Sequence, residues 1–315
     1  MGNDPEWKYL TTKQEADDLH AIVTALKTAL RGKWIATGVS KNGNTAIEFR
    51  YFYPEDVDGT VPFCSPILTS LNDVRPISYM LKECGTPEVN ATMNKIVEKL
   101  LKGAEQGFYK TFREYQIESE EVIATFTQYC YGVLNIYFNS FMNVSRSSWA
   151  KYFPALDTPD NKLCEIIDEM VPATYENDKE EDMSFYPYYI QQVKELGIES
   201  CLTDETLVWL KGSSCTEESI ITMRLRPQDK WLMKTYDNTV QTKIANEFLP
   251  TTTCKILLVY SKDDPWTGGR PKEFNNPNVK VLINPVGIHD ECLKSKEETY
   301  DEATVKAIKA FVDGL

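Results

Sequence analysis

Residues 33–43 read Lys33-Trp34-Ile35-Ala36-Thr37-Gly38-Val39-Ser40-Lys41-Asn42-Gly43. The short apolar run at the front, residues 34–36, predicts a buried strand that stops at Gly38. Ser40 follows where the chain must turn, and residues 44–49 then resume at helical spacing. A strand, a tight turn that carries a serine and a helix are the parts of a nucleophile elbow, so Ser40 is a candidate nucleophile.

The elbow would give this serine a catalytic setting. The turn holds the hydroxyl clear of the backbone, and the helix behind it offers amide donors and a positive dipole end to an oxyanion. We expect the backbone N–H of Lys41 to be one such donor. The usual motif is Gly-x-Ser-x-Gly, but Asn42 stands in place of the second glycine and Gly43 comes one place late. Because ordinary turns also contain Gly-x-Ser, the catalytic interpretation depends on the rest of the chain.

The length and charge of the chain exclude several classes of protein. Its 315 residues suit one large α/β domain, or a domain with a sizeable insertion. The net charge of −13 argues against nucleic acid or an anionic membrane as a partner. No segment is long and apolar enough to span a membrane. Solubility explains the acidic charge most simply, although an acidic cleft would also suit a substrate with a free amino group.

The cysteines and histidines predict neither a metal site nor a cofactor. The eight cysteines contain no C-x-x-C pattern, and the chain has only two histidines, His20 and His289. Disulfides would form if the protein is exported, but their pairing does not follow from the sequence. The N-terminus shows no basic region and no apolar signal segment. We therefore expect either a cytoplasmic protein or the later part of a longer exported chain.

The first seventy residues predict alternating helices and strands. A capping-box spacing at residues 12–15 opens a helix over 12–31, which leads into the elbow strand. After the elbow helix, residues 57–65 form a second predicted strand. This alternation predicts a parallel sheet with right-handed crossovers. His20 lies on the first helix and is expected to be a surface residue without a catalytic role.

A long helical insertion follows, over residues 71–249. Helical patterns cover residues 77–84, 89–101, 108–115, 121–141 and 191–196. We expect this insertion to form a cap, and residues 1–70 and 250–315 to form the sheet domain. Core packing is the expected role of most of its aromatic residues, with lining of a substrate cleft as the alternative. These are Phe108, Tyr109, Trp149, Tyr152, Phe153, Tyr186, Tyr188 and Tyr189.

The sheet resumes near the C-terminus. Residues 255–260 and 279–284 are apolar runs typical of buried strands. The first is followed by Asp263 and Asp264, and the second by a loop that contains His289. A final amphipathic helix is predicted over 297–315, with Val305, Ile308, Phe311 and Val312 facing inward.

The three strand ends together predict a catalytic triad. In open α/β sheets the active groups collect beyond the carboxyl ends of the strands. The order Ser40, then Asp264 or Asp263, then His289 is the order that α/β-hydrolases use. Serine needs a neutral imidazole to accept its proton, and a carboxylate fixes the imidazole tautomer. His289 falls where the third member of the triad is required.

Several segments resemble the secreted tripeptidyl aminopeptidases that favour proline, which are serine peptidases related to prolyl carboxypeptidase and dipeptidyl peptidase II. The resemblance rests on residues 38–43, on Asp264-Pro265-Trp266, on residues 7–11 and on residues 187–191, with Phe52-Tyr53-Pro54-Glu55-Asp56-Val57-Asp58-Gly59 between them. It implies an α/β-hydrolase fold, with Ser40 as nucleophile, Asp264 as acid and His289 as base. It also implies that the helical cap limits access to peptide ends, and that the full-length parent is secreted or periplasmic.

The chain departs from this family in two places. Family members usually have glycine at the position of Asn42, and they have a longer segment before the elbow. That segment includes the first sheet strands and a loop near the oxyanion site. We therefore expect the sheet to lack its N-terminal part, with an exposed edge that pairs with a second copy or aggregates.

Two hypotheses follow from these patterns. The first is a serine exopeptidase that releases short, tripeptide-type peptides from free N-termini, with a preference for proline at the cleavage site. The second is an inactive or weakly active relative that acts as a binding or dimerising module. A general esterase or lipase is a lesser alternative, because Asp264-Pro265-Trp266 and the cap segments resemble peptidases.

Overall fold

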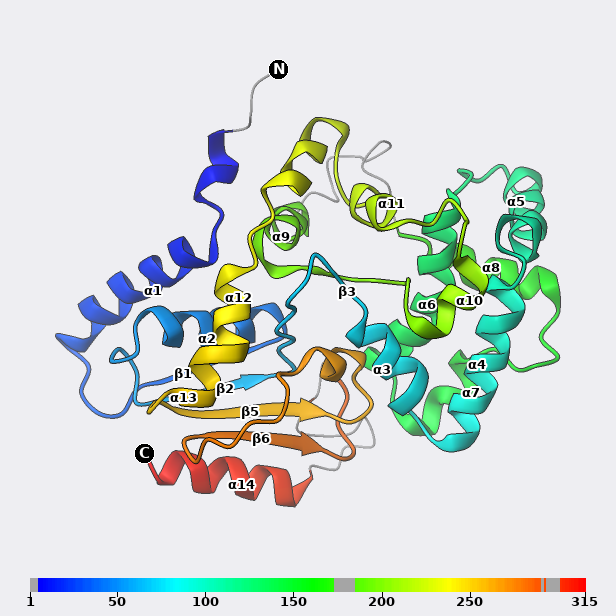
Figure 1. The fold of residues 1–315 in the computed structure, drawn as a ribbon. Helices are drawn as coiled ribbons and strands as arrows, with labels where there is room; N and C mark the ends of the chain where they lie inside the picture. The colour runs from blue at the N-terminus through cyan, green and yellow to red at the C-terminus, as the bar shows by residue number, and fades with distance from the viewer. Residues whose placement is uncertain (1–4, 173–184, 290–291, 293–300) are drawn as a thin grey trace.

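The computed structural model describes residues 5–172, 185–289, 292 and 301–315. A four-stranded parallel sheet forms its centre (Figure 1), and this confirms the predicted α/β-hydrolase fold. The strands lie in the order β1 (Ile35–Val39), β2 (Gly59–Phe63), β5 (Lys255–Ser261) and β6 (Val279–Asn284). The arrows of β5 and β6 point toward the helical insertion, so the carboxyl ends of the strands face it.

Helices cover both faces of the sheet. α1 (Thr12–Lys27) precedes β1 and is capped by the hydroxyl of Thr11, which accepts from the N–H of Gln14. It ends earlier than the predicted 12–31. α2 (Lys41–Phe52) follows β1, and Ile47 on it packs with residues of β5. α14 (Glu302–Asp313) lies against the other face, beside β6.

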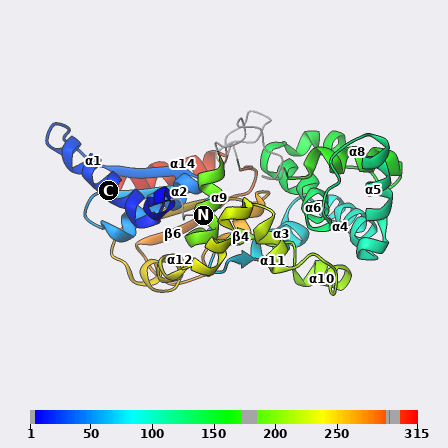
Figure 2. The same ribbon diagram turned by 90° about the horizontal axis from the view of Figure 1, so that it is seen from above.

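Between β2 and β5 the chain is chiefly helical, as the sequence predicts. One group of helices gathers away from the sheet (Figure 2), around a core of buried apolar and aromatic side chains. Its members are α3 (Arg75–Glu83), α4 (Pro87–Leu101), α5 (Phe108–Glu118), α6 (Phe126–Asn143), α7 (Trp149–Tyr152) and α8 (Asp160–Met170). The remaining elements are β3 (Asn72–Asp73), α9 (Tyr186–Gln191), β4 (Ile198–Glu199), α10 (Asp204–Leu210), α11 (Glu217–Thr222), α12 (Thr239–Lys243) and α13 (Leu249–Thr251).

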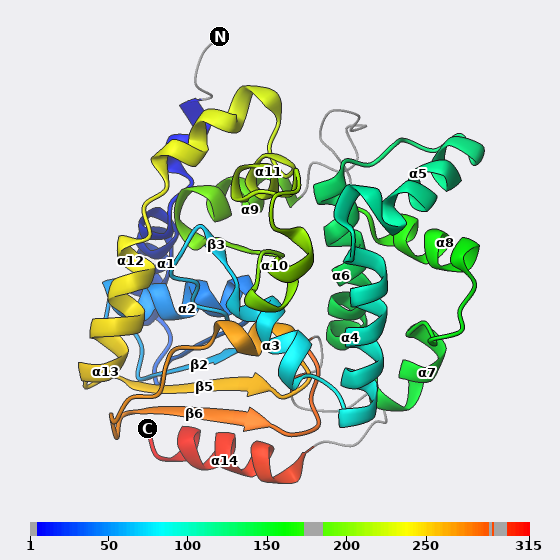
Figure 3. The same cartoon turned by 45° about the vertical axis from the view of Figure 1, so that its right-hand side comes forward.

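The last part of the predicted cap packs on the sheet. Ile244, which follows α12, and Leu249 of α13 lie in one buried cluster with Ile47 of the elbow helix and Ile256 of β5. Figure 3 shows α12 and α13 beside α2 and the sheet, apart from α4 to α8. The apolar side chains of this segment therefore help to hold the elbow helix in place.

Three expectations drawn from apolar runs about burial are wrong. The run at the elbow predicted a buried strand, but β1 is only half-buried, because it pairs with a single neighbour, β2, among the described strands; this agrees with the exposed edge expected for a sheet that lacks its N-terminal part. Strand β6 was expected to be buried, but Val281 and Ile283 are 42% and 39% exposed, since α14 covers only the opposite face. In α14, Val305 and Val312 are 39% and 37% exposed, and the inward contacts come from Ile308 and Phe311.

No helix in the described part of the chain is long and apolar enough to cross a membrane.

A buried carboxyl group on the elbow helix predicts an unusual pH dependence of stability. Glu48 is 1% exposed, and the side-chain N–H of Gln241 donates to its Oε1 at 2.5 Å. Burial raises the pKa of Glu48 to about 8 from its ordinary 4.5. The unfolded chain therefore releases this proton at lower pH than the folded chain does. The free energy of unfolding should fall by several kcal/mol between about pH 4.5 and 8, and this contribution levels off above pH 8.

We expect Glu48→Gln to remove this fall, because glutamine carries no titrating proton. Urea unfolding at pH 5 and pH 8 measures it: the difference between the two midpoints should be smaller in the variant than in the parent protein. Glu98→Gln is the matched control, since Glu98 is 45% exposed in its side chain on α4. An unchanged difference in Glu48→Gln would contradict the assignment.

Candidate active site

Ser40 lies at the sharp turn between β1 and α2, as the elbow motif predicts. Its φ of +57° and ψ of −129° are a strained combination for a residue with a side chain. Two hydrogen bonds hold the turn: the N–H of Ser40 donates to the carbonyl of Phe63 at 2.8 Å, and the N–H of Gly43 donates to the carbonyl of Ser40 at 2.9 Å. Such strain persists where neighbouring structure enforces it, most often at functional sites.

The two glycines of the elbow explain why Asn42 is tolerated. A Cβ at Gly38 would lie 2.3 Å from the backbone oxygen of Asn42, and a Cβ at Gly43 would lie 1.7 Å from the hydroxyl of Ser65. Asn42 itself is exposed. The close approach of the elbow helix to the loop after β2 therefore falls at residue 43, and glycine is required there instead of at residue 42.

Asp264 and His289 form a buried hydrogen-bonded pair. The Nδ1 of His289 lies 2.8 Å from Oδ2 of Asp264, and the two side chains are 5% and 0% exposed. The other carboxylate oxygen of Asp264 accepts from the N–H of Trp266 at 2.9 Å, which opens the short helix η8 (Pro265–Gly269). Asp264 follows β5 and His289 follows β6, so both lie beyond the carboxyl ends of neighbouring strands.

Asp263, the alternative acid, has different partners. Its Oδ1 accepts from the N–H of Gly85 at 3.0 Å, and its Oδ2 accepts from Nε of Arg146 at 2.5 Å. Arg146 also donates to the carbonyl of Pro285, in the loop that leads to His289. The carboxylate that reaches the imidazole is therefore that of Asp264, while Asp263 links the loop after β5 to the loop before α4 and to Arg146.

Cys64 lies between the elbow and the Asp264–His289 pair. It follows Phe63, whose carbonyl accepts from Ser40, and it has a φ of +48°. Its Sγ, a carboxylate oxygen of Asp264 and a ring nitrogen of His289 all lie within 4.8 Å of one another. Asp264 and His289 therefore lie beside the residue that follows β2, and the backbone of Ser40 is bonded to the last residue of that strand. The sequence analysis missed Cys64, although its place directly after a predicted strand was the available signal.

Cys64, Asp264 and His289 are the one group of side chains, in the part of the chain that is described, whose donor atoms could suit a metal ion. Contact with Cys292 and burial raise the pKa of Cys64 well above its ordinary value. A protonated thiol is a poor metal ligand. The ring nitrogen Nδ1 of His289 is already bonded to Asp264. The donor chemistry therefore favours a proton-transfer pair over a metal site.

Lys41 and His20 lie on the helices that the sequence predicts for them. Lys41 is the first residue of α2, a position whose N–H has no partner within the helix. Its side chain pairs with Glu15, so the ammonium group is directed to α1. His20 lies on α1, 2.6 Å from the carboxylate of Asp56 and stacked on Tyr53.

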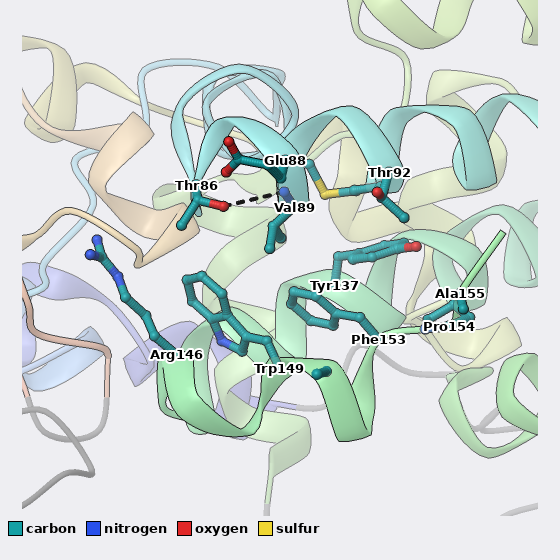
Figure 4. A pocket seen from close by; sticks show the side chains of 12 residues that line it. Thr86, Glu88, Val89, Thr92, Tyr137, Arg146, Trp149, Phe153, Pro154 and Ala155 are labelled. Atoms are coloured by element: carbon teal, nitrogen blue, oxygen red, sulfur yellow. Dashed lines mark hydrogen bonds between the residues drawn. The ribbon is translucent and has the colours of Figure 1, made fainter.

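A cavity of about 430 Å³ lies within the helical insertion, and Arg146, which bonds to Asp263, is one of the residues that line it. It lies between α4 on one side and the helices η3 (Arg146–Ser148) and α7 on the other (Figure 4). Figure 4 shows Arg146, Thr86 and Glu88 at one end, and Pro154 and Ala155 at the other. Of the aromatic residues singled out in the sequence, Trp149 and Phe153 line this cavity, whereas Tyr109 and Tyr186 are buried in cores.

The chain is similar in sequence to known peptidases. A model of the PS-10 peptidase S37 family matches residues 2–285. The prolyl tri/tetrapeptidyl aminopeptidase of Streptomyces mobaraensis is 25% identical over 278 residues, which are 84% of this chain and 54% of that protein. The chain thus spans about half the length of this curated relative.

Solved structures show weaker similarity. Rv0554 from Mycobacterium tuberculosis is 14% identical with a TM-score of 0.39, and the match covers 97% of this chain and 73% of that one. A thermophilic esterase from Thermogutta terrifontis is 12% identical with a TM-score of 0.33, covering 96% and 72%. The family match, which covers most of the sequence, is the finding that places the protein: the chain belongs to the S37 family of peptidases.

Proposed function

We propose that this chain is a serine exopeptidase that releases short, tripeptide-type peptides from free N-termini, with a preference for proline before the cut. The observation that carries the proposal is the buried Asp264–His289 hydrogen bond beside the strained elbow of Ser40. A serine, a histidine and a carboxylate gathered in this way are the groups that acyl transfer requires.

The chemistry follows from the roles of the three side chains. His289 accepts the hydroxyl proton of Ser40 as the serine oxygen attacks the peptide carbonyl, and Asp264 holds the proton on Nδ1. The N–H of Lys41 donates to the oxyanion that forms. His289 then gives the proton to the leaving amine, which breaks the peptide bond and leaves an acyl-serine. Water, activated by the same imidazole, releases the peptide acid.

The specificity part of the proposal has two supports. The similar Streptomyces protein carries the name prolyl tri/tetrapeptidyl aminopeptidase. In addition, the helical insertion lies beyond the carboxyl ends of β5 and β6 (Figures 1 and 3). We expect it to limit access by long chains, which would favour chain ends over the middle of a folded protein.

Chromogenic substrates test the proposal. We expect Ala-Ala-Pro-p-nitroanilide to be cleaved with a kcat/KM at least tenfold above that of Ala-Ala-Ala-p-nitroanilide, and the N-acetylated forms of both to be cleaved more slowly. Hydrolysis of p-nitrophenyl butyrate serves as the comparison for a general esterase. Cleavage of the ester without cleavage of any peptide would overturn the peptidase proposal.

A further inference from the structure

Three buried cysteines meet inside the helical insertion. Cys130 lies on α6, Cys201 follows β4 after one residue, and Cys215 lies two residues before the start of α11. Each side chain is at most 3% exposed, and all three belong to the apolar core of the insertion. All three are free thiols in the structure. The fold therefore gathers reactive groups from three separate segments at one buried place.

Cys215 is the central member of this group. Its Sγ lies 3.3 Å from the Sγ of Cys201, which is direct contact between the two sulfur atoms. The thiol of Cys130 is also hydrogen-bonded to Cys215. A disulfide bond holds its sulfur atoms about 2.05 Å apart, so Cys201 and Cys215 need to approach each other by only about 1 Å to form one.

The same contacts decide which of the thiols is the nucleophile. Hydrogen bonds from Cys130 and from Cys201 hold the pKa of Cys215 well below its ordinary value, against the opposing effect of burial. The hydrogen bond to Cys215, together with burial, raises the pKa of Cys201. Burial is the main cause that raises the pKa of Cys130. Cys215 is thus the thiolate of the group, and the thiolate is the form that attacks a disulfide.

A metal ion suits this group less well than a covalent bond does. A structural metal site needs several thiolates that converge on one point, whereas Cys130 and Cys201 hold their protons. Among the residues that the structure describes, these three sulfur atoms are not a set that lies within 4.8 Å of one another. Two of the three are in contact, and two thiols are what a disulfide requires.

The contacting pair encloses a short segment that polar contacts hold to the rest of the insertion. Residues 201–215 carry α10, and Glu205 on this helix pairs with Lys82 of α3. Near the other end, the N–H of Ser214 donates to Oε1 of Glu105 at 2.6 Å. A covalent bond between the two ends would close this segment into a loop, which restricts the unfolded chain and so stabilises the folded one.

We propose that Cys201 and Cys215 form a disulfide bond under oxidising conditions, with Cys130 left as a thiol. An external disulfide, such as oxidised glutathione, takes up the two electrons. The Cys215 thiolate attacks it, forms a mixed disulfide and releases one glutathione thiolate, which takes the proton of Cys201. The sulfur of Cys201 then attacks the sulfur of Cys215 and expels the second glutathione, which takes a proton from the solvent.

Peptide mapping of the oxidised protein tests the pairing. The whole chain is refolded from urea with reduced and oxidised glutathione, because the thiols are buried once it is folded, and the remaining thiols are blocked with N-ethylmaleimide. Trypsin cuts after Lys211, so the expected bond joins peptide 195–211 to peptide 212–224. Cys130, in peptide 114–146, should carry the maleimide. Maleimide on all three cysteines, or a bond from Cys130 in the parent protein, would overturn the assignment.

Cys201→Ser tests the central place of Cys215. With the nearer partner removed, Cys215 should bond to Cys130, so that peptide 114–146 is joined to peptide 212–224. Cys164→Ser is the matched control, because Cys164 lies on α8 in the same core and should leave the bond of the parent protein unchanged. A Cys201→Ser protein in which maleimide blocks both Cys130 and Cys215 would contradict the shared position of Cys215.

Thermal unfolding measures what the bond does for the fold. Dithiothreitol should lower the Tm of the oxidised parent protein by roughly 5–10 °C, because the reduced chain gains freedom when it unfolds. Cys215→Ser removes the shared sulfur, so dithiothreitol should shift the Tm of this variant far less. An equal shift in the two proteins would overturn the proposal, since the effect would then come from other cysteines.

Discussion

An organophosphonate probe should label Ser40 alone, and His289→Ala should abolish that labelling. A serine in an ordinary turn does not react with such probes, because nothing accepts its proton. In this protein Ser40 has the strained elbow conformation, and His289 is held by Asp264 at 2.8 Å. Loss of the imidazole should also lower peptidase turnover by three or more orders of magnitude. Intact mass and peptide mapping give the labelled site.

His20→Ala is the control for this experiment. His20 lies on α1, pairs with Asp56 and stacks on Tyr53, so its removal should leave labelling unchanged. The triad would be wrong if the label fell on another residue, or if the His20 variant lost labelling and the His289 variant kept it.

Asp264→Asn should reduce turnover about ten-thousandfold, which is the loss found for the equivalent change in the chymotrypsin-type triad. An asparagine amide facing Nδ1 stabilises the imidazole tautomer that carries its proton on the nitrogen facing serine. That tautomer cannot accept the serine proton. The backbone bond from Trp266 to the side-chain oxygen can persist in the variant, so the local fold should be retained. Steady-state kinetics with Ala-Ala-Pro-p-nitroanilide measures the effect.

Asp263→Asn gives the matched comparison at the neighbouring position. Asp263 contacts Arg146 and Gly85 and has no described contact with His289. Its substitution weakens the ion pair with Arg146, so the loss of turnover should be far smaller than at residue 264. A larger loss at 263 than at 264 would reverse the assignment of the acid.

The sequence placed the three candidate residues at the correct elements. Ser40 follows β1, Asp264 follows β5 and His289 follows β6, each in the loop that the apolar runs predicted. This was possible because strand ends and helix starts are local features, set by apolar runs, glycines and caps within a few residues. The parallel sheet and the helical insertion followed from the same local patterns, and the family followed from short motifs.

The burial of the edge strands could not be predicted in this way. The apolar runs at residues 34–36 and 279–284 match those of central strands. Their exposure depends on how many strands lie beside them and on which face a helix covers. Those facts are set by segments far away in the chain, such as α14 against β6.

The sequence by itself therefore determined the fold class, the elbow and the places of the three candidate residues, because each depends on short-range spacing. Only the tertiary structure decided that Asp264 rather than Asp263 meets His289, that Gly43 supplies the close approach missing at Asn42, and that Cys64 lies beside the pair. It also brought Arg146 to Asp263 across 117 residues. These contacts join distant segments, and the choice between neighbouring side chains depends on packing directions that no local pattern contains.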